Sequence, residues 1–126
     1  MTTNYKAGHF AETIALWFLR LKGYRFVAKN FITGQGTNAG EVDLIMKRHK
    51  TLVFIEVKKR KTLQKALYAI SSKQQMRLTK GALSFLKSHP EYRNFQLRFD
   101  AVICVANRLP KHIKNAWSNR CGLVVL

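Results

Sequence analysis

Two acidic residues and a lysine stand where they could bind a metal ion and act on a phosphate group. Asp43 lies in one short apolar segment, Glu56 and Lys58 lie in the next, and the polar run 47–50 separates the two. If the segments are strands of a hairpin folded about that run, Asp43 falls opposite residue 55 or 56. Directly opposed residues share a face about 5 Å apart, and alternation puts Lys58 on the face of Glu56. The pattern predicts two carboxylates beside an ammonium group.

Carboxylates this close repel each other, and two arrangements relieve the repulsion. A hard divalent cation between them is one, because such cations prefer carboxylate oxygens. A structural ion pair across the hairpin, with Lys58 as the cation, is the other. The local sequence is compatible with both.

The charge balance of the chain restricts the partners that it could bind. Lys and Arg number 23, Asp and Glu number 6, and the net charge is +17. An excess of this size favours a polyanion, with nucleic acid ahead of an anionic membrane surface or an acidic protein. An average chain of this length has roughly fifteen acids. Three of the six retained here lie between residues 41 and 56, which points to a specific use.

Residues 7–22 are predicted to form a helix that is apolar on two sides. One face carries Phe10, Ile14, Trp17, Phe18 and Leu21, and Gly23 is a stop signal. The opposite face places Glu12 inside a second apolar stripe with Ala15, Leu16 and Leu19. A glutamate among apolar neighbours is a candidate functional acid, with a salt-bridged helix acid as the alternative. Trp17 is expected in the core.

The remaining segments predict an α/β fold with a central mixed β-sheet flanked by helices. A second helix begins at Ser71 or Ser72, ends near Ser88 before Pro90, and buries a stripe of apolar residues. That stripe contains Leu78, Ala82, Phe85 and Leu86. The expected strands are 24–27, 41–46, 51–58, 95–106 and 123–126, with a loop over 33–40 and a basic connection over 58–65. Length and composition suit one domain, residues 1–126.

Membrane and secretory signals are missing from the sequence. No run approaches the ~20 apolar residues that span a bilayer, and residues 1–6 hold no signal-peptide core. Cys104 and Cys121 make neither a disulfide framework nor a metal motif, and Cys104 is expected to be a buried free thiol. These features lead us to expect a cytoplasmic protein that does not bind membranes.

The two central segments resemble a known nuclease motif. Gly40-Glu-Val-Asp-Leu-Ile45 followed by Phe54-Ile-Glu-Val-Lys58 and Arg60 is similar to the core of the PD-(D/E)XK nuclease superfamily, which has the restriction endonuclease-like fold. The chain resembles most closely the YraN-type family of small, uncharacterised bacterial proteins. Similar residues extend along nearly the whole chain: Ala11-Glu12, Gly23-Tyr24, Asn30, Lys73, Arg77-Leu78, Arg98-Phe-Asp100 and residues 109–117.

The resemblance implies roles for individual residues. Asp43 and Glu56 would be metal ligands, and Lys58 would orient or deprotonate the attacking water or stabilise charge on the phosphate. Glu12 would support the metal or the water, as in resolvase-type nucleases. The implied cofactor is Mg²⁺ or Mn²⁺, as one or two ions. Glu41 is an additional candidate that could instead pair with a basic neighbour.

Basic residues near these acids are candidates for contacts with nucleic acid. Lys59, Arg60 and Lys61 continue the run that begins at Lys58, and they adjoin the acidic segment. Lys73 and Arg77 share a helix face one turn apart. Asp100 is expected to pair with Arg98, two residues away on the same strand face. The loop 33–39 looks longer than the resemblance leads us to expect.

The sequence is compatible with three functions. The first is a metal-dependent endonuclease acting on DNA, including branched or processed DNA. The second is a non-catalytic nucleic-acid-binding module on the same fold. The third, a basic protein that binds an acidic partner or a membrane surface, gives no use for clustered acids. A homodimer formed through a strand or through the segment around Trp117 is compatible with each.

Overall fold

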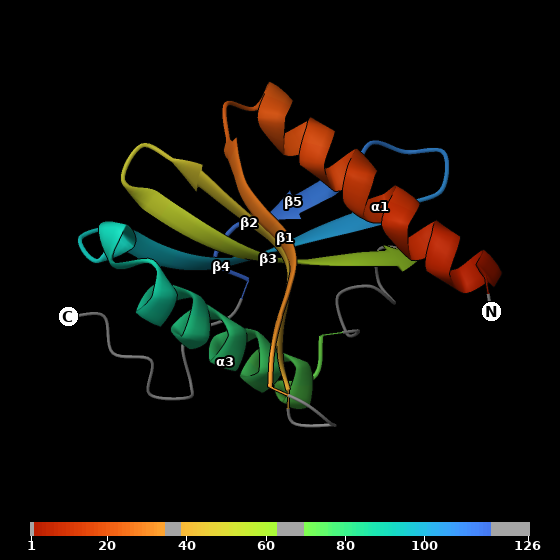
Figure 1. Cartoon of the computed structure of the whole chain (residues 1–126). Coiled ribbons are helices and arrows are strands. Elements are labelled where there is room, and N and C mark those ends of the chain that lie inside the picture. Colours follow the sequence, from red (N-terminus) through yellow and green to blue (C-terminus); the bar gives the residue numbers. More distant parts are fainter. Residues whose placement is uncertain (1, 35–38, 63–69, 117–126) are drawn as a thin grey trace.

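In the part of the chain that the structure describes, a mixed five-stranded sheet lies between two helices, one on each face (Figure 1). The computed structural model describes residues 2–34, 39–62 and 70–116, with the backbone alone for residues 2–9. These strands follow chain order across the sheet, with β3 and β4 parallel and the other described neighbours antiparallel. The elements are α1 (Thr2–Leu21), β1 (Arg25–Thr33), β2 (Gly40–Arg48), β3 (Thr51–Arg60), α3 (Ser72–Ser88), a 3₁₀ turn (Pro90–Tyr92), β4 (Gln96–Val105) and β5 (Lys111–Ile113). The predicted fold class is confirmed.

The hairpin of β2 and β3 has the register expected from the sequence. Leu44 pairs with Ile55 and Arg48 with Thr51, so only His49 and Lys50 form the turn. His49 adopts a φ of +54°, a conformation that favours glycine or asparagine. The predicted strand 41–46 was therefore too short at the turn, whereas the predicted start of the next strand at Thr51 and the pairing of the two strands are correct.

Strand β3 is buried on both faces, as its sequence predicted. Residues 52–55 are all fully buried, and their side chains alternate between the two helices. Val53 and Ile55 pack towards α1, whereas Leu52 and Phe54 pack towards α3. The strand continues to Arg60, so the expected basic connection from residue 58 begins instead as part of the sheet. A parallel crossover through α3 then leads to β4.

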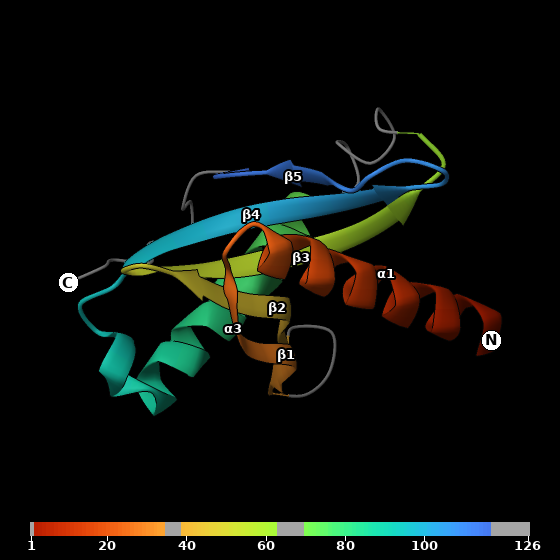
Figure 2. The same ribbon diagram turned by 90° about the horizontal axis from the view of Figure 1, so that it is seen from above.

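Helix α3 begins and ends where the capping signals predicted. Ser71 is the N-cap, and its Oγ accepts a hydrogen bond from the backbone N of Gln74 at 3.2 Å. The helix lies along β2 (Figure 2). A Cβ on Gly40 would lie 2.6 Å from the backbone N of Gly81, and a Cβ on Gly81 would lie 2.7 Å from Val42 Cγ2. Gly40 and Gly81 therefore allow α3 and β2 to approach each other closely beside Glu41.

Helix α1 packs on the opposite face through small residues. Ala11, Ala15 and Leu19 are buried there, whereas Trp17 is 56% exposed. The expectation that Trp17 belongs to the core is wrong, because the stripe that contains Ala15 and Leu19 faces the sheet. The helix also begins earlier than predicted, at Thr2. In the described ranges, no helix combines the length and apolar character that a membrane crossing requires.

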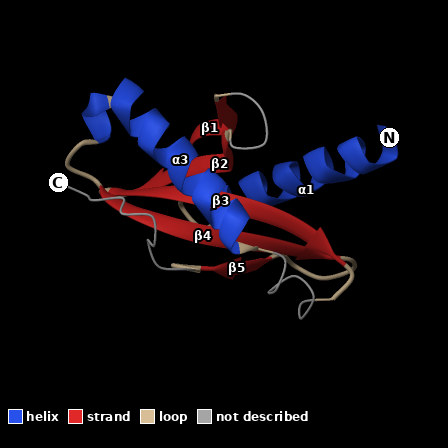
Figure 3. Cartoon of the chain, turned by 90° about the horizontal axis from the view of Figure 1, so that it is seen from below, coloured by secondary structure: helices blue, strands red, loops and turns tan. Residues whose placement is uncertain are grey.

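The edges of the sheet differ from the sequence prediction. Strand β1 runs over nine residues instead of the four expected, and Lys111–Ile113 form a short strand that was not predicted (Figure 3). The predicted strand 123–126, Trp117 and Cys121 lie outside the described residues, as do residues 35–38 of the long loop.

A buried polar cluster attaches β5 and the turn after α1 to β4. Asp100 is 0% exposed and accepts hydrogen bonds from Arg98 Nε and Nη2, both at 2.8 Å. His112 Nε2 lies 2.7 Å from its Oδ2, and the backbone N of Asn115 donates to Oδ1 at 2.9 Å. Arg98 also donates to the hydroxyl of Tyr24 at 2.7 Å. The predicted Asp100–Arg98 pair is confirmed as one part of this structural cluster.

Replacing Gly81 tests the close approach of α3 to β2. In an exposed helix Gly→Ala stabilises by roughly 0.5–1 kcal/mol, but here the new methyl would meet Val42 and the backbone N of Glu41, 3.1 Å away. We expect Gly81→Ala to lower the free energy of unfolding by about 1–3 kcal/mol in urea denaturation. Lys87→Ala, on the exposed last turn of α3, is the control and should change stability by less than about 0.5 kcal/mol. A stabilised Gly81→Ala would contradict the close contact.

Candidate functional site

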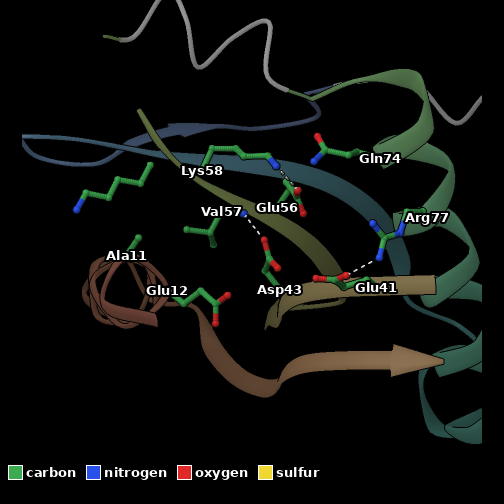
Figure 4. Close-up of a pocket in the computed structure, with 10 residues that line it drawn as sticks. Ala11, Glu12, Glu41, Asp43, Glu56, Val57, Lys58, Gln74 and Arg77 are labelled. Carbon is green, nitrogen blue, oxygen red and sulfur yellow. Dashed lines mark hydrogen bonds and ion pairs between the residues drawn. The ribbon is translucent and has the colours of Figure 1, made fainter. Parts of the chain in front are cut away.

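Four of the six acidic residues of the chain line one pocket at the end of the β2–β3 hairpin away from its turn (Figure 4). The pocket has a volume of about 200 Å³ and lies between α1 and the first turns of α3. Its lining residues are Ala11, Glu12, Glu41, Asp43, Glu56, Val57, Lys58, Lys59, Gln74 and Arg77. The structure thus brings together all the predicted catalytic and metal-binding residues, whose roles stay predictions.

Asp43 enters the pocket where β2 and β3 part from each other. The last pair of their ladder is Leu44 with Ile55. One residue further on, Asp43 Oδ2 accepts a hydrogen bond from the backbone N of Val57 at 2.8 Å. The Asp43 carboxylate therefore accepts the hydrogen bond that a backbone carbonyl would accept in a regular ladder. Beyond this point β2 and β3 diverge, which leaves room for the pocket. The expected placement of Asp43 beside Glu56 is confirmed.

The environment of Asp43 disfavours its charged form. Burial and the nearby carboxylate of Glu56 raise the pKa of Asp43 from its ordinary 3.8 to about 8. Glu12 adds to this effect, whereas the hydrogen bond from Val57 opposes it. The pocket therefore concentrates negative charge that a proton or a cation would relieve.

Lys58 contacts the carboxylate of Glu56, two residues earlier on β3. Its Nζ lies 3.0 Å from Glu56 Oε2, and its side chain is only 12% exposed. The side chain points towards the pocket in Figure 4, as alternation along the strand predicted. Lys59 also lines the pocket and lies near Cys104 of β4, so the two neighbouring lysines occupy different surroundings.

Glu12 reaches the pocket from α1, on the side opposite α3 (Figure 4). With its amide oriented to donate, Asn30 Nδ2 lies 2.8 Å from Glu12 Oε1 and 3.3 Å from Oε2. Asn30 has a φ of +53°, which places this β1 residue in the left-handed region. Because asparagine tolerates that conformation better than most residues, Asn30 suits both the bend and the contact. Sequence reasoning noted Asn30 but assigned it no role.

Glu41 and Arg77 form an ion pair on the α3 side of the pocket. Arg77 Nη2 donates to Glu41 Oε1 at 2.7 Å, and its Nε donates to the carbonyl oxygen of Ala39 at 3.1 Å. Glu41 therefore has the basic partner that the sequence left open as its alternative role. The same contacts hold Arg77 at the pocket wall, where it remains partly exposed.

Gln74 is a pocket residue for which the sequence predicted no functional role. Its backbone N contacts the Ser71 cap, but its side chain also lines the pocket. Its Oε1 is buried and has no hydrogen-bond partner among the described residues. A buried acceptor of this kind is costly unless a ligand or water satisfies it. In the sequence, the sign that Gln74 could reach the pocket was its position one turn before Arg77 on the same helix.

The other predicted nucleic-acid contacts lie outside the pocket. Arg60 Nη1 donates to the carbonyl oxygen of Lys59 at 2.7 Å, and Lys61 and Lys73 are exposed. Lys73 precedes Arg77 by one turn of α3, as predicted. None of these three residues lines the pocket, so they could contact only the outer parts of a bound polyanion.

The donor set of the pocket suits a hard cation that keeps most of its waters. Within the described part of the chain, no three His, Cys, Asp or Glu side chains are grouped to hold a metal ion between them. Mg²⁺ requires fewer protein ligands, usually one or two carboxylates with waters and substrate oxygens. Asp43 and Glu56 supply two carboxylates, and the buried Oε1 of Gln74 supplies a neutral acceptor for a bound water. The residues present therefore fit such an ion.

Among the described residues, this arrangement of a five-stranded mixed sheet, two flanking helices and a pocket at the end of the central hairpin is a restriction endonuclease-like fold. Residues 11–104 match the family described as "Uncharacterised protein family UPF0102", and the chain belongs to that family. The YraN-type resemblance of the sequence is thereby confirmed. A UPF0102 protein of Paramagnetospirillum magneticum is 42% identical over 112 residues, which cover 89% of this chain and 87% of that protein. A UPF0102 protein of Nitrobacter winogradskyi is 41% identical over 113 residues, which cover 90% of this chain and 92% of that protein.

The raised pKa of Asp43 predicts a specific pH dependence of stability in metal-free buffer. Between its unfolded pKa of 3.8 and its folded pKa of about 8, the folded protein binds more protons at this site than the unfolded chain does. Rising pH therefore removes stability through this window. Asp43→Asn, which cannot ionise, should be more stable than wild type by about 1–2 kcal/mol at pH 8.5 and should gain nothing at pH 4.

Urea denaturation with a chelator present at both pH values measures this difference. Glu91→Gln, at an exposed glutamate of the 3₁₀ turn, is the matched control and should show no pH-dependent gain. An Asp43→Asn variant that is less stable than wild type at pH 8.5 would show that Asp43 is a satisfied structural acid.

Proposed function

We propose that this protein is a metal-dependent endonuclease that hydrolyses phosphodiester bonds in DNA. One observation carries the proposal: a chain with a net charge of +17 gathers four of its six carboxylates in a single pocket. Carboxylates repel a phosphate backbone unless a cation lies between them. The motif resemblance to the PD-(D/E)XK superfamily and the restriction endonuclease-like fold support the same activity.

Asp43 and Glu56 would hold one or two Mg²⁺ or Mn²⁺ ions. When bound, such an ion polarises a phosphoryl oxygen and favours an ionised water as the nucleophile. Glu12 faces Asp43 across the pocket and is held by Asn30, so it is placed to accept a hydrogen bond from water at the site. Glu41 takes part less directly, because Arg77 already neutralises it.

Lys58 is the residue that we propose faces the scissile phosphate. Its ammonium group is nearly buried and contacts Glu56, so a phosphate at the carboxylates would lie within its reach. There it would stabilise the charge that develops on the phosphate, or orient the attacking water. Charge of this kind is stabilised most strongly where water is excluded.

The basic residues around the pocket would bind the phosphate backbone on either side. Lys59 and Arg77 line the pocket, and Arg60, Lys61 and Lys73 lie further out. These contacts carry no base specificity, so binding should depend strongly on salt and weakly on sequence. We also propose that the protein acts in the cytoplasm, where the buried free thiol of Cys104 would stay reduced.

Divalent cations should stabilise the folded protein through the carboxylate pair. A ligand that binds only the native state adds about 2.7 kcal/mol at a concentration 100 times its Kd. We expect Mg²⁺ or Mn²⁺ to raise the Tm of the wild type measurably at pH 8. Asp43→Asn and Glu56→Gln should lose that shift, and Glu91→Gln should retain it. A Tm that does not respond, together with no heat of metal binding by calorimetry in the presence of DNA, would leave Asp43, Glu56 and Lys58 as an ion-pair cluster.

Removal of Lys58 separates catalysis from binding. Lys58→Ala should retain most DNA affinity, since one cation among 23 contributes little to the total field. Loss of one group that stabilises the transition state typically lowers the rate by about 10²–10³-fold. We expect a loss of this size in single-turnover cleavage with Mg²⁺ or Mn²⁺. The substrate is chosen by first screening wild type on duplex, single-stranded and branched DNA and RNA.

Lys61→Ala is the matched control for the cleavage assay. Lys61 belongs to the same basic run but is exposed and does not line the pocket, so its removal should weaken binding slightly and slow cleavage no further. Equal, small losses in both variants would make Lys58 an ordinary phosphate contact. If the wild type binds nucleic acid tightly and cuts nothing in the screen, the protein is a binding module on a nuclease fold.

A further inference from the structure

A second cavity opens beside the acidic pocket, between α1 and the end of β4. Its volume is about 230 Å³, and its walls are mostly apolar. Phe10 and Ile14 of α1 form one side, and Cys104 and Val105 of β4 form the other. Burial raises the pKa of the Cys104 thiol, so this part of the wall stays uncharged at neutral pH. The interior suits a flat apolar group.

The cavity and the acidic pocket share two lining residues, Ala11 and Lys59. Alanine has the smallest side chain after glycine, so Ala11 separates the cavity from the acidic pocket by little more than a methyl group. Lys59 extends from β3 between them, and Lys58 next to it contacts Glu56. A ligand in the cavity would therefore lie beside the carboxylates of the acidic pocket.

Three of the residues that line the cavity have strongly polar side chains. Lys59 and Arg108 bring positive charge, and Asn107 brings an amide that can both donate and accept hydrogen bonds. Asn107 lies at a φ of +60° in a turn closed by a hydrogen bond from Arg108 N to Val105 O at 3.2 Å. Phe10, on the opposite side, is 64% exposed. The cavity thus combines an exposed aromatic ring, an amide and two cations around an apolar interior.

These features match the chemistry of a nucleotide. An apolar cavity of about 150 Å³ is large enough to hold benzene, so 230 Å³ leaves room for a heterocyclic base. A base stacks on an aromatic ring, its edge hydrogen-bonds to an amide, and its phosphate pairs with cations. A purely apolar ligand would use neither the amide nor the cations.

We propose that this cavity receives an unpaired nucleobase of the DNA whose backbone occupies the acidic pocket. The inference rests on the proposed nuclease function and defines its substrate class as DNA with at least one unpaired nucleotide beside the scissile phosphate. A base inside a duplex is stacked and paired on both sides, so it reaches such a cavity only at the cost of unstacking. At a bulge, a flap or a junction a base is already unpaired, so binding does not have to supply that unstacking energy.

Replacing Phe10 tests this inference by binding alone, with Ca²⁺ in place of Mg²⁺ or Mn²⁺ so that a cation neutralises the carboxylates while cleavage is suppressed. Fluorescence anisotropy compares three labelled DNAs: a paired duplex, the same duplex with one bulged nucleotide, and the bulge made abasic. Loss of one base–aromatic stack should weaken the binding of the bulged duplex to Phe10→Ala by roughly 5- to 100-fold. Binding of the paired and abasic DNAs should change by less than about twofold, within the spread of ordinary surface substitutions.

Trp17→Ala is the matched control on the same helix. Trp17 is also aromatic and exposed, but it lies two turns from Phe10 and does not line the cavity. It should bind all three DNAs as wild type does. A Phe10→Ala effect that is equal on the abasic bulge, or that Trp17→Ala reproduces, would overturn the inference.

The same experiment separates failure of the cavity from failure of the proposed function. If wild type binds none of the DNAs, DNA is not the substrate and both proposals fall. If wild type binds all three DNAs and Phe10→Ala weakens none of them selectively, the cavity has no role in base recognition and the nuclease proposal stands.

Discussion

The register of the β2–β3 hairpin is the constraint on which the site depends. His49 and Lys50 form a two-residue turn, so Leu44 must pair with Ile55, and Asp43 comes next to Glu56. A slip of one residue would turn every side chain of a strand to the opposite face. It would also place Asp43 and Glu56 on opposite faces and turn the core side chains of β3 towards the wrong helix. The same burial that stabilises the sheet therefore fixes the positions of the carboxylates, and the strained φ of His49 is tolerated because the strands on either side determine the turn.

Two buried aspartates show how the fold distinguishes structural from functional charge. Burial alone would raise the pKa of Asp100, but hydrogen bonds from His112, Arg98 and Asn115 outweigh it and hold that pKa below its usual range. Asp43 has one hydrogen bond from a backbone N and faces other carboxylates, so its pKa is raised. The chain has 23 Lys and Arg residues that could donate hydrogen bonds to a buried carboxylate. That so few hydrogen-bond donors surround Asp43 is therefore a property of the site, as expected where a ligand supplies the missing positive charge.

Much of the fold and the site could be predicted because their signals are local. The capping serine of α3, the apolar run of β3 and the two-residue spacing of Glu56 and Lys58 each depend on a few neighbouring residues. The orientation of α1 was harder, because a helix with apolar residues on two sides has no unique core face. Only the sheet selects the face of Ala11 and Ala15. Strand β5 is three residues long and depends on the Asp100–His112 contact, which no local pattern encodes.

The close packing of α1 links the two cavities into one surface. Because Ala11 and Ala15 have small side chains, the helix axis can lie near β3 and β4. Glu12, next to Ala11, then reaches the carboxylates on one side, while Phe10 stands over the apolar cavity on the other. Larger residues at the buried positions would move the helix outward and separate Glu12 from Asp43. Ala11 and Ala15 therefore face the sheet and bring Glu12 into the site. Because they form the core side of α1, the bulkier apolar stripe with Phe10 and Trp17 stays exposed.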